Sequence, residues 1–345
     1  MNHSTDPEHV RARALPAQPL GGGIGRGAEP PSEFPPPLVV ITGPTGVGKT
    51  EVAVRLASRL RVEVVSADSR QVYRGMDVGT AKPTGAERAA APHHLVDVVD
   101  PEERYHAARF RAEAREAISA ILERGKLPLV VGGTGLYVRV LLRGLLPAPP
   151  ADPEVRRELK AFLEREGVEA LHTRLGAVDA EAARRIHPRD RVRIIRALEI
   201  YRLTGLPLGT PTHWRQSRPE WTTLVVGLTR PRASLYAALD ARVDRMVVRG
   251  LKEETRGLLD AGYGPALPAM QGIGYRHFVR VLRGAWSESE AIRTMKRDTR
   301  QYAKRQWTWF AREPGIRWVD VEAAGGLEGA AAQVEKWILE EGLLP

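Results

Sequence analysis

A glycine-rich segment directly after an apolar strand constrains this chain more than any other feature of its sequence. The strand is the β-branched run Leu38–Thr42, of the kind that lies buried on both faces of a parallel sheet. Gly43–Thr50 follows with the spacing G-x-x-x-x-G-K-T, and helical periodicity then runs through Glu51–Leu60. In this context the glycines let backbone N–H groups turn inward around phosphate oxygens, at the positive end of a helix. The segment predicts a phosphate-binding P-loop.

The residue types in this loop suit a bound phosphate compound. Lys49 brings a positive charge to the terminal phosphate, and the Thr50 hydroxyl suits Mg²⁺, which makes Thr50 the predicted metal ligand and Mg²⁺ the predicted cofactor. The other predicted phosphate contacts are Gly43, Thr45, Gly46, Val47 and Gly48.

The loop alone does not say which phosphate compound it holds. The apolar strand Leu127–Val131 ends on Gly132-Gly133-Thr134, without the acidic residue that usually holds Mg²⁺ at this place in an ATPase. This disfavours a plain ATPase. A P-loop small-molecule kinase and a non-catalytic, NTPase-like RNA-binding module remain open as alternatives.

Strands and helices alternate in the first part of the chain. A second apolar strand is predicted at Val62–Ser66, and a long helix at Arg104–Arg124 precedes the strand Leu127–Val131. Alternation of this kind is typical of an α/β domain with a parallel sheet. With the P-loop, it predicts a P-loop NTPase-like parallel sheet as the core of the fold.

The pattern then changes twice. Residues 148–218 carry charged, helical periodicity, which predicts a helical insertion, and strand character returns at Thr222–Leu228 before a mostly helical C-terminal part. The predicted core therefore comprises residues 38–147 and 219–345. Residues 1–37 contain thirteen glycines and prolines and no periodic apolar face, so we expect a disordered tail there.

Composition narrows the partners and the compartment. The chain has no cysteine, which excludes disulfides, thiolate metal sites and cysteine nucleophiles. It has no apolar run of the ~18 residues that a membrane span needs and no secretory signal, so the expectation is a cytoplasmic monomer without a membrane partner. The net charge of +10 favours a polyanionic partner, although a solvated, arginine-rich surface would give the same balance.

Two further segments carry candidate functional residues. Asp68 follows the strand Val62–Ser66 and is succeeded by Ser69, Arg70 and Gln71, a polar set better suited to reading a substrate than to holding a metal alone. The bland alternative for Asp68 is a helix cap. Adjacent His93-His94 lack further ligands at useful spacing, so we interpret them as structural.

A predicted helix, Thr294–Phe310, gives the basic charge a location. Arg293, Arg297, Arg300 and Lys304 recur at steps of four, three and four, so they share one face, while a mostly apolar face lies beside it. The first face can meet phosphates while the second packs. Arg191, Arg193 and Arg196 form a second basic cluster in the insertion.

Six ordered blocks of this sequence resemble the tRNA dimethylallyltransferases, over about residues 38–318. The blocks are Gly43–Thr50, Asp68–Pro83, Pro92–Leu95, Gly132–Tyr137, Gly274–Arg276 and Arg300–Trp309. One departure is Val47, where many relatives carry serine; because the loop uses the backbone N–H there, we expect little consequence.

The resemblance implies a reaction and a site. The donor would be dimethylallyl diphosphate, the acceptor N6 of adenosine 37 beside the tRNA anticodon, and the insertion would grip the anticodon stem-loop. Asp68 matches the family's general base, Thr134 a second residue at the reacting centre, and Arg242 an arginine on the diphosphate. The tRNA contacts expected by the same resemblance are Asp68, Ser69, Arg70, Gln71, Thr134, Arg156, Val192, Arg193, Ile194, Ile195, Arg196, Gln271, Gly272, Ile273, Gly274, Tyr275, Arg276, Arg297, Arg300, Lys304 and Arg305.

The chemistry is consistent with these residue types. An adenine amino group is a poor nucleophile, and a positioned carboxylate that accepts its proton typically contributes ~10²–10⁴-fold. Charge also builds on the leaving diphosphate, where each preorganised donor contributes about 3–4 kcal/mol. Because a stacked anticodon loop leaves no room for this reaction, we hypothesise that the adenine is flipped into a channel.

Overall fold

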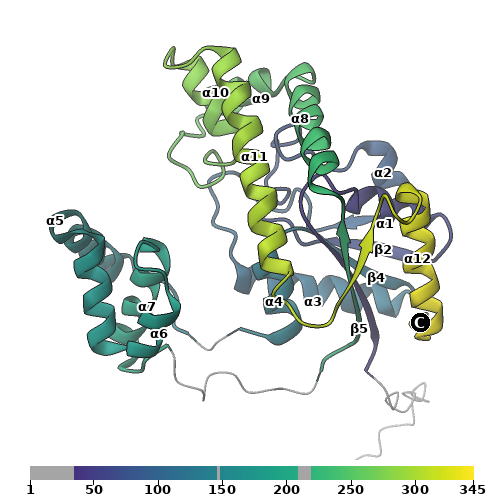
Figure 1. Ribbon diagram of the computed structural model, residues 1–345, viewed down its shortest axis with the longest axis horizontal. Helices are drawn as coiled ribbons and strands as arrows, with labels where there is room; N and C mark the ends of the chain where they lie inside the picture. Colours follow the sequence, from purple (N-terminus) through teal and green to yellow (C-terminus); the bar gives the residue numbers. More distant parts are fainter. Residues whose placement is uncertain (1–34, 146–147, 209–218) are drawn as a thin grey trace, which may run out of the picture. The chain divides into compact units, whose positions relative to one another are not determined.

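The computed structural model describes residues 35–145, 148–208 and 219–345, so the predicted tail before residue 35 and residues 209–218 of the predicted insertion lie outside it. Six parallel strands form one sheet in the order β3-β2-β4-β1-β5-β6 (Figure 1). Their bounds are β1 Pro37–Thr42, β2 Val62–Ser66, β3 His93–His94, β4 Leu127–Val131, β5 Thr222–Thr229 and β6 Ile316–Asp320. The predicted α/β fold with a parallel sheet is confirmed.

Alternate residues of the central strand β1 point to opposite faces of the sheet. Val39 and Ile41 belong to a core with α1 (Lys49–Ala57) and α12 (Gly326–Glu340), and all of these side chains are buried. Leu38 and Val40 belong to the opposite core with α3 (Ala107–Glu123) and α4 (Gly135–Arg143). A strand covered on both faces must be apolar throughout, which explains the continuous run in the sequence.

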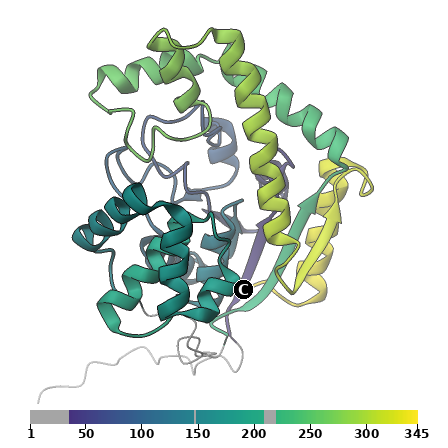
Figure 2. The same cartoon turned by 60° about the vertical axis from the view of Figure 1, so that its left-hand side comes forward.

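The C-terminal helices form a third hydrophobic core over the segment that follows Asp68. These helices are α8 Arg232–Val248, α9 Leu251–Asp260, α10 Tyr275–Leu282 and α11 Glu288–Phe310. Val72 and Met76 of the segment after Asp68 pack with residues of all four. Helix α11 lies against α8 (Figure 2). Arg300 of α11 pairs with Asp240 of α8 at 2.6 Å.

The helices within the predicted insertion have a hydrophobic core of their own. They are α5 Pro153–Val178, α6 Ala180–Arg185 and α7 Arg191–Thr204. The core is built from such residues as Leu159, Leu171 and Leu198. Gly167 has a non-helical φ of 85°, so α5 is kinked there rather than continuous.

Several boundaries differ from the predictions, and one element was missed. Helix α11 begins at Glu288, not Thr294, because Ser287 caps it by accepting a hydrogen bond from the Glu290 N–H at 3.2 Å. Helix α3 begins at Ala107 rather than Arg104. Strand β6 at Ile316–Asp320 was not predicted; it pairs with β5 at the edge of the sheet and buries only Val319. No helix in the described ranges is long and apolar enough to span a membrane.

Candidate active site at the carboxyl ends of the strands

The P-loop, Asp68 and Thr134 lie where three parallel strands end. The turns after β1, β2 and β4 are joined by backbone hydrogen bonds: Gly132 N–H donates to Ile41 at 3.1 Å, and Thr134 N–H donates to Ala67 at 3.2 Å. The P-loop, Asp68 and the Gly132–Thr134 turn therefore form one edge of the sheet. Ligands of open α/β sheets bind at this edge.

The P-loop needs its glycines for steric reasons that the structure makes explicit. Gly43 has φ +135°, and a Cβ there would lie 2.4 Å from the Leu228 carbonyl oxygen of β5. Gly46 and Gly48 also have positive φ, with Leu239 and Leu327 packed against them. The Val47 side chain is fully buried in the sheet core, so only its backbone can face a ligand. Helix α1 then starts at Lys49, and Thr50 lies in its first turn.

Lys49 is held over the loop by two backbone carbonyls. Its Nζ donates to Gly43 O at 3.0 Å and to Pro44 O at 2.9 Å. Burial lowers its pKa to about 8; nearby Asp68 opposes this shift and Arg242 adds to it. A bound anion would relieve the cost of keeping this buried ammonium charged.

Arg242 comes from α8 and lines a pocket that Asp68 and Thr45 also line. Burial lowers its pKa from the ordinary arginine range, Asp68 opposes the shift, and Arg245 adds to it. Arg242 and Lys49 are therefore two desolvated cations within the field of one carboxylate. That arrangement favours an anionic ligand.

Asp68 both shapes a turn and faces the pocket. Its Oδ1 accepts hydrogen bonds from Arg70 N–H at 2.8 Å and Gln71 N–H at 3.3 Å. No helix directly follows Asp68 in the described residues, so the helix-cap alternative is wrong; one carboxylate oxygen holds a turn, and the side chain also lines the pocket beside Arg242. These two properties are compatible, since the turn fixes the carboxylate in place.

Thr134 stands between the Asp68 turn and α11. Its Oγ1 accepts a hydrogen bond from Ser69 N–H at 3.1 Å. It also contacts the hydroxyl of Tyr302, whose pKa is raised to about 12, first by burial and then by Asp68, with the Thr134 hydrogen bond acting in the opposite direction. Tyr302 stays protonated at neutral pH and can donate a hydrogen bond.

A pocket of about 290 Å³ joins Asp68, Arg242 and Tyr302. Its lining includes Thr45, Asp68, Ser69, Arg70, Arg242, Gln271, Gly272, Ile273, Tyr275, Arg276, Tyr302 and Arg305. Thr45 of the P-loop, the Asp68 segment and the segment before α10 thus meet in one cavity. Thr134 lies behind this lining, and the Gln71 side chain turns away to donate to Ala81 O at 3.2 Å.

Three predicted cations of α11 lie outside this pocket. Arg297 pairs with the adjacent Asp298 at 3.0 Å, and Arg300 pairs with Asp240. Lys304 lines a separate hollow beside exposed Trp307. Of the α11 cations, Arg305 alone is among the residues that line the pocket.

Two predicted RNA-binding arginines of the insertion form ion pairs within the insertion. Arg156 and Arg196 both pair with Glu199, at 2.9 and 2.6 Å, and the Glu199 side chain is 0% exposed. Ile194 and Ile195 are buried in the insertion core, so their side chains face inward. Val192, 78% exposed, and Arg193 are the outward-facing members of this segment.

Two anchors that sequence reasoning missed shape the segment after Asp68. Glu254 of α9 accepts hydrogen bonds from three consecutive N–H groups, those of Asp77, Val78 and Gly79, and from Tyr275 Oη at 2.6 Å. Tyr275 packs so closely that a Cβ on Gly79 would lie 2.5 Å from its ring. The pocket wall formed by Tyr275 is thereby fixed.

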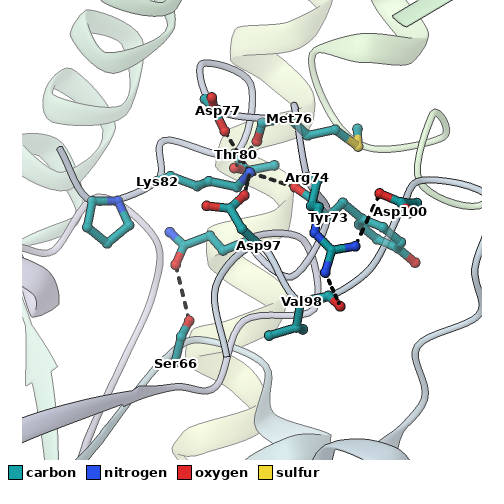
Figure 3. Close-up of polar contacts among 12 residues, drawn as sticks. Ser66, Tyr73, Arg74, Met76, Asp77, Thr80, Lys82, Asp97, Val98 and Asp100 are labelled. Atoms are coloured by element: carbon teal, nitrogen blue, oxygen red, sulfur yellow. Dashed lines mark hydrogen bonds and ion pairs between the residues drawn. The ribbon is translucent and has the colours of Figure 1, made fainter. Parts of the chain in front are cut away.

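The second anchor is buried Lys82, shown with its partners in Figure 3. Its Nζ donates to Tyr73 O and Asp77 Oδ1, both at 2.6 Å, and to Asp97. Arg88 completes the pairing of Asp97 at 2.8 Å. This charge-balanced cluster supports the loop beneath the pocket.

His93 and His94 are structural, as interpreted from the sequence. They form the short strand β3, where His93 Nδ1 hydrogen-bonds Ala91 O at 2.6 Å and His94 Nε2 contacts Glu63 at 2.7 Å. Within the described ranges, no group of three or more His, Cys, Asp or Glu side chains could hold a metal ion.

The fold and the pocket define an α/β protein with a P-loop sequence, in which Thr45 of that loop shares one pocket with Asp68, Arg242 and Arg305. Two family models match the sequence, IPP transferase over residues 71–313 and isopentenyl transferase over residues 36–93. The chain belongs to the IPP transferase family, that of the tRNA dimethylallyltransferases.

Individual relatives agree over nearly the whole fold. The tRNA dimethylallyltransferase of Desulforudis audaxviator is 48% identical over 89% of this chain and 99% of its own, and that of Syntrophobacter fumaroxidans is 52% identical over 84% and 85%. The tRNA isopentenylpyrophosphate transferase structure from Staphylococcus epidermidis has a TM-score of 0.65 at 36% identity, covering 88% of this chain and 99% of that one. A eukaryotic dimethylallyltransferase captured acting on tRNA gives 0.71 at 32%, covering 87% and 75%.

Proposed function

We propose that this protein transfers the dimethylallyl group of dimethylallyl diphosphate to N6 of adenosine 37 in tRNA and releases diphosphate. The observation that carries the proposal is a single pocket that Thr45 of the P-loop, Asp68 and Arg242 line together, with buried Lys49 within the electrostatic reach of both charged residues. An anionic leaving group and a proton-accepting carboxylate are the two requirements of alkylation at an adenine amino group.

The donor diphosphate occupies the P-loop. The backbone amides from Gly46 to Thr50, at the start of α1, bind its oxygens, and Lys49 and Arg242 neutralise the charge that develops as the allylic C–O bond breaks. The electron pair of that bond leaves with the diphosphate. Two buried cations with lowered pKa values gain most from this anion.

Mg²⁺ fits this site through few protein ligands. The described residues contain no carboxylate cluster for it, and Thr50 offers a hydroxyl at the first turn of α1. Mg²⁺ usually keeps several waters and binds proteins through few groups plus substrate phosphates. When bound, it adds positive charge to the diphosphate oxygens.

The acceptor adenine lies on the Asp68 side of the pocket. Its N6 forms the new C–N bond, and Asp68 accepts the proton that N6 loses. The two backbone hydrogen bonds to Oδ1 hold the carboxylate in place, which leaves Oδ2 to face the amino group. Tyr302 borders the same position and can hydrogen-bond the base, while Thr134, behind the lining, holds the Asp68 turn by accepting from Ser69 N–H.

The RNA approaches over the basic rim. The mouth of the pocket is surrounded or supported by Ser69, Arg70, Gln71, Arg305 and the segment Gln271–Arg276. Positive charge extends along α11 through Arg297, Arg300 and Lys304. The insertion presents Val192 and Arg193 to the anticodon stem-loop. Arg156 and Arg196 remain partly exposed beside Glu199 and can each add one phosphate contact. We propose that the enzyme works as a cytoplasmic monomer.

A dual-label assay tests this function. The protein is incubated with Mg²⁺, ATP labelled in its γ-phosphate, dimethylallyl diphosphate labelled in its prenyl group, and unmodified tRNA. We expect prenyl label on the RNA and diphosphate release that depends on RNA, without phosphate release from ATP. ATP turnover with no label on RNA would instead favour a kinase or an NTPase-like module.

A further inference from the structure

Gln306 is a buried amide that links two turns of the site, and neither the P-loop motif nor the proton transfer requires it. It lies on α11 and is 7% exposed. Its Oε1 accepts a hydrogen bond from Thr45 N–H at 2.8 Å, and its Nε2 donates to Gly133 O, also at 2.8 Å. One side chain thus satisfies a donor on the P-loop and an acceptor on the turn that carries Thr134.

The surrounding geometry shows how closely this link is built. A Cβ on Gly133 would lie 2.3 Å from Gln306 Nε2, so the turn can approach the amide only because residue 133 is glycine. The Thr45 N–H points to Gln306, and Thr45 is therefore fixed by α11 rather than free to turn toward a phosphate. The contact of Thr45 with a phosphate stays a prediction for the rest of this residue, which lines the pocket.

The link continues across the site. Thr134 follows Gly133 and accepts from Ser69 N–H, and Ser69 follows Asp68. A path of hydrogen bonds and adjacent residues therefore runs from the P-loop through Gln306 and Thr134 to Asp68. On the same helix, Tyr302 and Arg305 line the pocket where the acceptor would lie.

We propose that Gln306 is a positioning residue that sets the separation between the donor diphosphate and the Thr134–Asp68 side of the pocket. It acts through Thr45 and Gly133 and touches no substrate. Because it belongs to the helix that also carries the basic rim, it joins RNA binding to the geometry of the P-loop. This inference rests on the proposed function for its activity readout.

Gln306→Glu gives a test that a merely structural role would not pass. A glutamate has the same shape; when ionised it still accepts from Thr45 but meets the Gly133 oxygen with negative charge and no donor. When protonated, it restores both hydrogen bonds. Burial raises the pKa of such a carboxyl, so it protonates within an accessible range of mildly acidic pH.

We expect kcat of Gln306→Glu at saturating tRNA and pH 8 to fall by about 10²-fold relative to the wild type, the cost of a misplacement of roughly 1 Å. The variant-to-wild-type ratio should then recover as pH falls. Gln301→Glu makes the same charge change at an exposed position of α11 and should keep a ratio near one at every pH. Gln306→Met, which loses both bonds without a charge, should lose activity with no recovery.

Diphosphate binding separates this inference from the proposed function. Calorimetry with inorganic diphosphate should show weaker binding to Gln306→Glu at pH 8 and recovery toward wild type at lower pH. If the wild type transfers no prenyl group, the proposed function fails, and this titration still tests Gln306. Ratios for Gln306→Glu that do not change with pH, or wild-type kcat in Gln306→Met, would overturn the inference.

Discussion

The two ends of strand β2 carry carboxylates in opposite situations. Glu63, near the amino end, is buried with a 4% exposed side chain and pairs with Arg124, Lys126 and His94 at 2.6 to 2.8 Å. Asp68, just past the carboxyl end, hydrogen-bonds only backbone amides among the described residues and faces a pocket. The strand is the same, but one carboxylate is neutralised within the protein and the other remains available to a ligand.

The cations at the two ends follow the same division. Although burial raises the pKa of Glu63, hydrogen bonds from Arg124, Lys126 and His94 outweigh it and lower the value to about 2. At the other end, Lys49 donates to loop carbonyls rather than to a carboxylate, and burial lowers its pKa. Charges that stabilise a fold are paired, whereas charges kept for a substrate are left desolvated and unpaired, which costs stability.

Asp68→Asn should give the largest effect, because the ligand-facing end of β2 loses its proton acceptor. Asparagine can keep the turn through its side-chain oxygen, so the fold and tRNA affinity should persist. We expect kcat to fall by about 10²–10⁴-fold in prenyl-transfer assays while the tRNA Kd from filter binding is unchanged. Loss of both in equal measure would make Asp68 structural, like Glu63.

Lys49→Met and Arg242→Met should follow with losses of about 10²–10³-fold in kcat/KM for dimethylallyl diphosphate, because each removes a charge aimed at the leaving group. Since both cations are desolvated without a carboxylate partner, thermal unfolding should show unchanged or higher stability. Lys336→Met, on α12 beside Glu340 at 3.7 Å, is the matched surface control and should leave the kinetics unchanged. A strongly destabilised Lys49→Met would show that Lys49 stabilises the fold, and would contradict the contrast between the stabilising charges around Glu63 and the ligand-binding charges near Asp68.

Glu63→Gln should act in the reverse sense, on stability and not on catalysis. We expect it to lower the free energy of unfolding by about 2 kcal/mol at pH 7, since a buried carboxylate that pairs with Arg124 and Lys126 is lost, and to leave kcat unchanged. The folded pKa is depressed, so this stability is present above pH 4.5 and is lost as pH falls toward 2. Urea titrations of both proteins at several pH values should show the difference shrinking across that window; a constant difference would argue against the ion pairs.

Thr50→Ala should give the smallest effect. Removing one hydroxyl from the ligands of Mg²⁺ should raise the Mg²⁺ concentration for half-maximal transfer by about tenfold, or about 1.4 kcal/mol. Saturating Mg²⁺ should restore most of kcat. An unchanged Mg²⁺ titration would remove Thr50 from the metal site.

Local patterns in the sequence were sufficient to predict the strands of the sheet core and the position of the P-loop. Strands such as Leu127–Val131 are apolar throughout because both faces are covered, and the bounds of this strand were predicted without error. Strand β6 was not predicted because it lies at the edge of the sheet with Arg317 and Trp318 exposed. Its sequence therefore shows neither a continuous apolar run nor an alternation of apolar and polar residues.

Long-range partners could not be read from the sequence. The role of Gln306 depends on its hydrogen bonds to Thr45 and Gly133, which are 261 and 173 positions away in the sequence. Likewise, Arg156 and Arg196 look the same in sequence whether they meet RNA or a buried glutamate at position 199. A basic cluster reports charge, and only the fold reports what the charge already touches.

The central claim is that Lys49, Arg242 and Asp68, at the carboxyl ends of the strands, carry out prenyl transfer to one adenine. Its most direct test is mass spectrometry of nucleosides and RNase fragments from unmodified tRNA that was incubated with the protein, Mg²⁺ and dimethylallyl diphosphate. We predict N6-dimethylallyladenosine at position 37 alone, and none in a tRNA with guanosine at that position. An unmodified adenosine 37, or equal modification of adenosines elsewhere, would contradict the account.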